Sequence, residues 1–328
     1  MVLMAASTTA PLDVVSAGAP APIDLPRGIE ISLEGSVQNP AFSPDGTQLL
    51  VTVWRGGYNL GPADLVIAPL DGSAPWELVA DGWDNVSLPG SAWSAAANAI
   101  VYSSTEDPHD EIWAVDMTGT HETRRITLHD NEVAYEPSWS PDGDEVVYEL
   151  HPLDVEGDGR IARSPTGEDE AANTAAEVFL TPSGEDCRQP NWAPAGDLVV
   201  FQCTEDGGES WTLWVSDPDG DDRRALQTGP LNATDASFSP DGRWVVFSGD
   251  DGESSADIWA VRVDGAELER LTEDPGYEGA PSWSPDGSQV AFEASDGDPD
   301  GDRTVVRIID LSDGFAMGNR RDFRPCNC

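Results

Sequence analysis

A five-residue motif that recurs along the chain limits its fold more than any other feature. The motif is an aromatic residue followed by Ser-Pro-Asp-Gly, and it occurs at residues 42–46, 139–143, 238–242 and 283–287. Degenerate copies begin at Trp93 and Trp192, so the six aromatic positions are 45 to 53 residues apart. A period of this length over six copies predicts a propeller or a similar array of repeats.

Each repeat has the pattern of four short strands. Pro-Asp-Gly predicts a tight hairpin turn with a left-handed Gly, and a β-branched and aromatic run follows it, as at 199–201 and 245–247. A third strand is expected at 111–115 and 257–261, and a short fourth strand at 125–128 and 269–272. With no helical periodicity between them, the repeats predict an all-β fold, a six-bladed β-propeller of four-stranded blades.

The last repeat lacks a good fourth strand, and this predicts how the ring closes. The segment 29–33 (Ile-Glu-Ile-Ser-Leu) has the pattern of a fourth strand without a blade of its own. We expect this N-terminal strand to complete blade six; the alternative is a strand from the tail at 320–324. The expected organisation is a disordered lead-in at 1–28, the propeller at 29–314 and a C-terminal tail at 315–328. The lead-in could be what remains of a signal peptide.

The repeat resembles the WD40-like (PD40) repeat of the TolB-type β-propellers, which has the same aromatic-Ser-Pro-Asp-Gly turn. The resemblance covers residues 29–314 and extends to the strands Glu111–Val115 and Asp257–Val261. It implies the propeller fold and leaves the function open, because the repeat occurs in translocation proteins, peptidase propellers and glycan lyases.

The charge of the chain excludes several classes of partner. It has 61 acidic and 17 basic residues, a net charge of −44, and every basic residue is Arg. Such a surface repels phosphate backbones and anionic lipids, so we expect no nucleic-acid binding. No apolar run approaches the ~20 residues of a membrane span, so we expect no membrane insertion. Cations, basic partners or a salty medium suit this chain.

Sequence motifs of catalysis are missing. The chain contains no G-x-S-x-G, H-E-x-x-H or C-x-x-C motif and no Gly-rich phosphate loop. Without Lys, Schiff-base chemistry is excluded. The four His do not converge on the expected channel, and we expect surface histidines. No residue is therefore assigned a catalytic role.

Acidic loops predict a calcium site. The segment 296–302 matches the D-x-D-x-D-G pattern, in which alternate carboxylates point at one ion, and the segment 154–159 is a near match. Both lack the carboxylate that an EF-hand has at position twelve, and a solvated acidic loop is the alternative. The candidate Ca²⁺ ligands are Asp296, Asp298, Asp300, Asp302, Asp154, Glu156 and Asp158.

Propeller geometry predicts which residues surround the channel mouth. Three residues before the aromatic anchors lie Asn39, Gly90, Glu136, Gln189, Asp235 and Ala280. Their carboxylates and amides suit a cation or a basic or amide-bearing ligand, and Tyr58 in the Gly-rich loop of blade one is a further candidate contact. We expect Glu136 and Asp235 to face each other across a gap that could hold a cation.

Two further groups have structural interpretations. The anchor aromatics and Trp113, Trp214 and Trp259 are expected to pack blade against blade. Cys187 and Cys203 are equally far from the turn of blade four, which makes them opposite neighbours in a hairpin and predicts a disulfide; two buried thiols are the alternative. A disulfide implies an oxidising compartment.

These observations favour a non-catalytic, monomeric propeller in the periplasm or outside the cell. It would bind a protein or peptide, basic or amide-bearing, at an acidic channel face, with Ca²⁺ as a possible stabilising ion. The alternative function is that of a propeller-type glycan lyase or hydrolase that uses carboxylates at the channel mouth. A third interpretation is that the acidity only maintains hydration in high salt.

Overall fold

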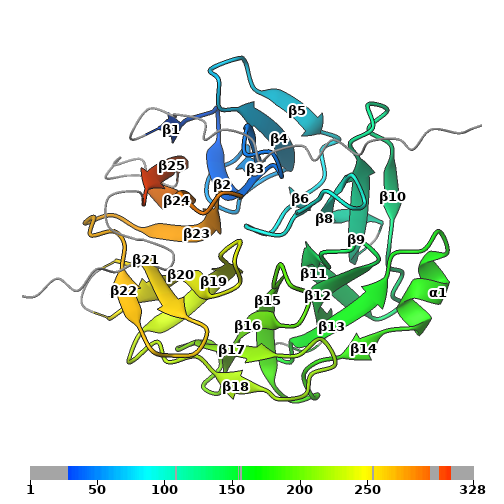
Figure 1. Ribbon diagram of the computed structural model, residues 1–328. Helices are drawn as coiled ribbons and strands as arrows, with labels where there is room; N and C mark the ends of the chain where they lie inside the picture. Colours follow the sequence, from blue (N-terminus) through cyan, green and yellow to red (C-terminus); the bar gives the residue numbers. More distant parts are fainter. Residues whose placement is uncertain are drawn as a thin grey trace, which may run out of the picture.

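The computed structural model describes residues 29–107, 109–153, 155, 157–252, 255–295 and 303–311. They form a ring of six β-sheets around a central channel (Figure 1). The predicted fold class is therefore confirmed. The chain begins with β1 (Glu30–Ile31). Blade one contains β2 (Ser36–Phe42), β3 (Gln48–Trp54), β4 (Ala63–Pro69) and β5 (Trp76–Val79). Blade two contains β6 (Asn85–Val86), β7 (Trp93–Ser94), β8 (Ala99–Asp107), β9 (His109–Asp116) and β10 (Thr123–Arg125).

Blade three contains β11 (Glu132–Trp139), β12 (Glu145–Pro152), β13 (Arg160–Pro165), α1 (Glu170–Ala175) and β14 (Val178–Phe179). Blade four contains β15 (Asp186–Trp192), β16 (Val199–Thr204), β17 (Thr212–Ser216) and β18 (Arg224–Ala225). Blade five contains β19 (Asn232–Phe238), β20 (Trp244–Asp250), β21 (Asp257–Arg262) and β22 (Leu268–Arg270). Blade six contains β23 (Glu278–Trp283), β24 (Gln289–Ser295) and β25 (Thr304–Asp310).

The N-terminal strand completes the sixth blade, as expected. The strand order of that sheet is β1-β25-β24-β23, with Glu30 opposite Arg307 and Ile31 opposite Val306. The seam is also hydrogen-bonded in the interior, where the buried Ser36 and Thr304 hydroxyls lie 2.8 Å apart. The alternative strand, from the tail, lies outside the described residues.

The recurrent turn has the same hydrogen bonds in each full copy. In the first copy the Ser43 hydroxyl donates to Asp45 (2.7 Å) and accepts from the Gln48 backbone N–H (3.1 Å). Gly46, at φ 71°, donates its N–H to the Ser43 carbonyl at 2.8 Å. The motif therefore encodes a hairpin that is held by its own Ser and Asp side chains, and its Gly occupies a conformation that L-residues adopt at a cost.

Six clusters of buried apolar residues fill the interfaces between successive blades, including the seam between blades six and one. Five of the six anchor aromatics are at most 7% exposed, and Trp93 is half-buried. Each sheet thus buries its faces against its two neighbours. No helix among the described residues has the length and apolar character that a membrane-spanning helix needs.

Three Trp residues that were expected in the core are only partly buried. Trp113, Trp214 and Trp259 lie on third strands and are covered by Arg side chains of the outer edge. The guanidinium carbons lie 5.8, 4.4 and 5.7 Å from the ring centres, for Arg125, Arg223 and Arg270 respectively. These cation–π contacts cover part of each ring, and the rings also pack against the apolar clusters between blades, as expected.

The predicted bounds of two outer strands need correction, and one short helix is added to the all-β pattern. The outer strands of blades two and five end at Arg125 and Arg270, because Ile126 and Leu271 turn inward toward the blade interfaces. Their N–H groups bond the Ile112 and Ile258 carbonyls at 2.7 and 2.8 Å. One short helix, α1, is inserted before β14 with Asp169 as its N-cap.

His129 is not a surface histidine. Its side chain is 4% exposed and lies between two Glu of different blades, with Nδ1 2.8 Å from Glu111 and Nε2 2.7 Å from Glu177. Burial lowers the pKa of His129, but the hydrogen bonds and charges of the two carboxylates outweigh burial and raise it to about 9. The Tyr148 hydroxyl also bonds Glu177. A buried imidazolium thus connects blade two to the α1 segment of blade three.

We predict that His129→Gln destabilises the protein in a pH-dependent way. The imidazole of the unfolded chain has its ordinary pKa of 6.5 and that of the folded protein a pKa of about 9, so its contribution to stability is complete below pH 6.5 and disappears as the pH rises through 9. The wild-type advantage should reach up to about 3 kcal/mol at pH 6. Urea unfolding at pH 6, 8 and 9.5 measures it, with His121→Gln as the control. A difference that does not change with pH contradicts the charged pairing.

Candidate functional site

A left-handed residue interrupts the innermost strand of every blade at the channel. The residues are Asn39, Gly90, Glu136, Gln189, Asp235 and Ala280, with φ between 47° and 89°. In five blades the register of the first strand pair shifts at this position, which is the mark of a β-bulge. For Glu, Gln, Asp and Ala this conformation is strained, and such strain tends to concentrate at functional sites. These are the six positions that the sequence places at the channel mouth.

Side chains from the second strands hold the bulges in place. The Gln189 N–H donates to Glu149 at 2.8 Å, the Asp235 N–H to Gln202 at 3.0 Å, and the Asn39 N–H to Glu293 at 3.3 Å. Each acceptor belongs to the preceding blade, with blade six preceding blade one. Glu149, Gln202 and Glu293 thus form a second polar ring beside the first.

These three acceptors were not predicted, although the sequence carries a signal for them. Each is the polar residue that directly follows an aromatic residue in the most apolar strand of its repeat, as in Val199-Val200-Phe201-Gln202. They lie opposite Tyr135, Arg188 and Gly279, one position before the bulge. A charged or amide side chain inside such a strand has to find a polar partner.

Gln189 occupies the gap that was expected between Glu136 and Asp235. Its amide nitrogen lies 2.8 Å from Asp235 Oδ1 and 3.4 Å from Glu136 Oε1. Its carbonyl oxygen accepts from the Asp235 N–H at 3.3 Å. The two carboxylates are therefore bridged by an amide of the chain itself, so a ligand has to approach them from the channel.

Tyrosine side chains form a second wall of the channel with Glu293. The hydroxyls of Tyr277 and Tyr58 lie 2.9 and 3.3 Å from Glu293 Oε1. The two rings meet edge to face at 6.1 Å. Tyr58 comes from the Gly-rich loop of blade one, as predicted from the sequence, and it is 38% exposed.

A cavity of about 620 Å³ joins these two walls. It brings together all five predicted ligand-binding residues, Asn39, Tyr58, Glu136, Gln189 and Asp235. Among the described residues that line the cavity none is basic, whereas six are acidic: Asp84, Asp110, Glu136, Glu149, Asp235 and Glu293. Two basic side chains lie close to the residues that line the cavity, but each is paired with an acid. His151 lies 3.1 Å from Glu149, and Arg188 lies 3.0 Å from Asp186.

The crowded carboxyl groups hold protons more tightly than free ones. Burial raises the pKa of Glu293 to about 7, with a smaller contribution from the charge of Asp235. Burial, then the charges of Glu149 and Asp235, raises the pKa of Glu136 well above its usual range. Burial also raises the pKa of Asp110 to about 6. A cation in the cavity would favour the ionised forms and would therefore displace protons.

Two polar groups of the cavity lining lack a hydrogen-bond partner within the described residues, the Gln38 amide nitrogen and the Trp54 indole Nε1. Gln38 is only 3% exposed. An unpaired buried donor is costly, so the position favours a ligand with an acceptor such as a carbonyl group.

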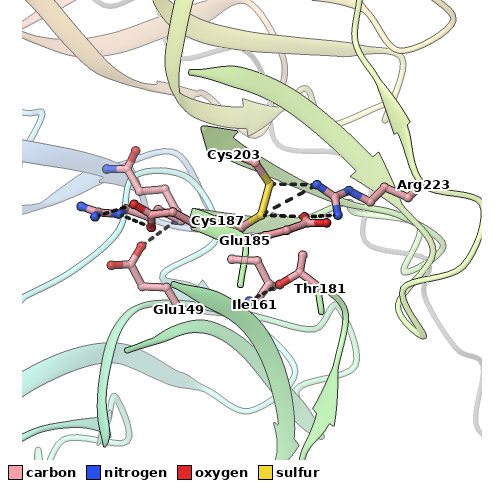
Figure 2. The surroundings of a disulfide bond; sticks show 10 residues. Glu149, Ile161, Thr181, Glu185, Cys187, Cys203 and Arg223 are labelled. Carbon is pink, nitrogen blue, oxygen red and sulfur yellow. Dashed lines mark hydrogen bonds and ion pairs between the residues drawn. A yellow bond between two sulfur atoms is a disulfide. The ribbon is translucent and has the colours of Figure 1, made fainter. Parts of the chain in front are cut away.

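The other predicted site residues lie elsewhere. Cys187 and Cys203 form a disulfide across β15 and β16 (Figure 2). Asp158 accepts the Gly184 N–H at 2.8 Å. The remaining calcium candidates lie outside the described residues: Asp154, Glu156, Asp296, Asp298, Asp300 and Asp302.

Comparison with known proteins gives a consistent picture of the fold. A family model described as the TolB beta propeller domain matches residues 27–236. TolB from Acinetobacter baumannii is 19% identical with a TM-score of 0.58, over 85% of this chain and 65% of that one. An oligogalacturonate lyase solved in complex with manganese is 15% identical with a TM-score of 0.57, over 87% of this chain and 90% of that one.

A third similar structure is a puromycin-hydrolyzing peptidase from Mycobacterium tuberculosis. It is 16% identical with a TM-score of 0.54, over 92% of this chain and 45% of that one. The chain thus spans less than two thirds of the TolB structure and less than half of the peptidase. A search of curated protein sequences gives no match. At these identities the similarity establishes the fold alone.

We predict that Glu293→Gln stabilises the protein increasingly as the pH rises. The carboxyl titrates near 4.5 when unfolded and near 7 when folded, so the cost of its burial is absent below pH 4.5, grows between pH 4.5 and 7 and is then constant. Above pH 7 the gain should be up to about 3 kcal/mol. Chemical denaturation at pH 5, 6, 7 and 8 measures it, with the exposed Glu205→Gln as the control. An equal effect at every pH would show that the pKa of Glu293 is not raised in the folded protein.

Proposed function

The chain belongs to the TolB β-propeller family, and on that premise we propose that it is a non-catalytic binding protein whose ligand is a basic or amide-bearing segment of a protein or peptide. The observation that carries the proposal is the channel cavity, in which six carboxyl groups meet without a basic residue in the lining. A site of this charge attracts cations and repels anions.

The walls of the cavity suit an organic cation on a peptide better than a bare charge. Tyr58, Tyr277 and Tyr135 offer ring surfaces beside the carboxyl groups Glu293 and Asp110. Arginine and lysine side chains bind to such combinations through ion pairs and through contact of their stems or heads with aromatic faces. The unpaired Gln38 amide would satisfy a backbone carbonyl of the same ligand.

The same charge argues against one alternative, a lyase acting on acidic glycans. An oligogalacturonate carries a carboxylate on each sugar, and six acidic side chains in the cavity would repel it. A hydrolase of neutral glycans is better supported, because a carboxyl group with a pKa of about 7, Glu293, can donate a proton at neutral pH. If Glu293→Gln abolishes hydrolysis of neutral oligosaccharides by the purified chain, the enzyme replaces the binding protein as the function.

We also propose that the protein acts as a monomer in the periplasm or outside the cell. Two observations support export: the disulfide between Cys187 and Cys203, a bond that persists in oxidising compartments, and membership of the TolB family. A monomer is supported because all six blade interfaces are made within one chain.

Calcium binding by the acidic loops is a separate part of the proposal. We predict that calorimetric titration of the metal-free protein with Ca²⁺ gives saturable binding and that EDTA lowers the melting temperature by mass action. Asp298→Asn should weaken the binding, whereas Asp71→Asn, in an exposed turn outside the acidic loops, serves as the control. Stabilisation by NaCl without any response to micromolar Ca²⁺ would favour adaptation to salt instead.

For the channel, we predict that the double variant Glu136→Gln, Asp235→Asn loses affinity for Arg- and Lys-containing peptides. A cationic ligand favours the ionised forms of these two carboxyl groups, so removing them should weaken binding about tenfold or more at low salt, mainly through slower association, and the loss should shrink as salt is added. Binding of a labelled peptide library at 20 and 300 mM NaCl measures this effect. The matched control is Glu205→Gln, Asp221→Asn, which changes the net charge equally at exposed positions away from the cavity. Equal losses in both variants would assign the effect to net charge alone.

A further inference from the structure

Away from the channel, the disulfide of blade four lies in a second polar cavity of about 620 Å³. Cys203, Glu185 and Arg223 line this cavity, and none of its lining residues is shared with the channel cavity. Cys187 is fully buried and Cys203 is 7% exposed. The disulfide is thus covered by the protein yet accessible from one side.

Three potential metal ligands lie together at the wall of this cavity. The sulfur atoms of Cys187 and Cys203, which are bonded to each other in the disulfide, and a carboxylate oxygen of Glu185 all lie within 4.8 Å of one another. Glu185 Oε2 is 3.6 Å from Cys187 Sγ (Figure 2). Two thiolates and a carboxylate, with a fourth position open to solvent, are a donor set typical of zinc, whereas calcium and magnesium prefer oxygen ligands alone.

Arg223 lies against the same three groups. Its Nη2 is 3.2 Å from Cys203 Sγ and 3.8 Å from Cys187 Sγ, and its Nη1 pairs with Glu185. The guanidinium is fixed by stacking on Trp214 at 4.4 Å and on Phe201 at 5.4 Å. A cation held at this place stabilises thiolates and orients the ligands of a metal from the second shell.

Three states of this cluster balance their charges. With the disulfide formed, or with it reduced to two protonated thiols, Glu185 and Arg223 neutralise each other. With the disulfide reduced and Zn²⁺ bound, two thiolates and the carboxylate are neutralised by the metal and Arg223. Two bare thiolates would leave two excess negative charges next to Glu185. The reduced cluster therefore holds either two protons or a metal ion, and only the reduced cluster offers two sulfur ligands.

We propose that Glu185, Cys187 and Cys203 form a zinc site that opens when the disulfide is reduced and closes when it re-forms. An external dithiol supplies two electrons and two protons, the S–S bond breaks, and the dithiol becomes a disulfide. Zinc then binds the two sulfur atoms and displaces one proton from each thiol. Oxidation of the two thiolates to the disulfide releases the metal.

The test uses the full chain with Cys326→Ser and Cys328→Ser, so that the tail thiols do not contribute. The protein is reduced with dithiothreitol, desalted under argon and titrated with Co²⁺. We expect one Co²⁺ per chain with a thiolate-to-cobalt charge-transfer absorption, which disappears when Zn²⁺ replaces it. The oxidised protein should show no such absorption. Absence of the band in the reduced protein, or its persistence in Cys203→Ser, overturns the proposal.

Two variants test the predicted ligand and its orienting residue. Glu185→Gln and Arg223→Gln should each weaken zinc binding about 10- to 100-fold. Glu205→Gln, an acid that lines the same cavity outside the cluster, should bind zinc like the parent. If Glu185→Gln and Glu205→Gln bind equally, the carboxylate is not a ligand and the proposed site is wrong.

A thermal measurement covers the case in which reduction loosens the hairpin. Zinc should raise the melting temperature of the reduced parent, because a ligand of the folded state stabilises it. The chain that also carries Cys187→Ser and Cys203→Ser should show no increase. An equal response of both chains would mean that zinc acts elsewhere, which contradicts the proposal.

Discussion

Each blade of this protein can bury its apolar faces only against its two neighbours. A four-stranded sheet with Val, Ile and Phe on both faces is unstable alone, and six such sheets satisfy one another only when the ring is complete. The pairing of β1 with β25 closes the ring, and the Ser36–Thr304 hydrogen bond lies beside it in the interior. Every other feature depends on that closure, including the channel.

The geometry of the ring also explains why the channel is polar. Inner strands surround the axis, and in each of them one left-handed residue lies at the channel. In three blades the backbone N–H of this residue takes an acceptor from the preceding blade, as Gln189 does from Glu149. Polar side chains on the second strands therefore satisfy the backbone and supply the carboxyl groups of the cavity.

Acidic side chains have different surroundings at the outer blade edges and in the channel. At the outer blade edges some acidic side chains are paired with Arg, which also covers Trp rings, as Arg270 does for Asp257 and Trp259. No basic residue among the described ones lines the channel cavity, and burial there raises the pKa of Glu136 and Asp110 and that of Glu293 to about 7. The proposed function depends on this contrast, because a cationic ligand would supply the charge that the channel lacks.

The sequence by itself determined the repeat, the number of blades, the closing strand and the six channel positions. All of these follow from local rules: the Ser-Pro-Asp-Gly turn, the alternation of strands and a fixed offset from the anchor aromatic. It also placed Cys187 opposite Cys203, since residues equally far from a hairpin turn face each other.

Only the tertiary structure decided which side chains meet across blades. Glu149, Gln202 and Glu293 become part of the site because bulges 40, 33 and 254 residues away in the chain need acceptors. The pKa of His129 is raised because Glu111 and Glu177, 18 and 48 residues away, bond its two ring nitrogens. Gln189 lies between Glu136 and Asp235, which come from the two neighbouring blades. Contacts of this kind depend on the angle between blades and on side-chain rotamers, which no periodicity in the sequence encodes.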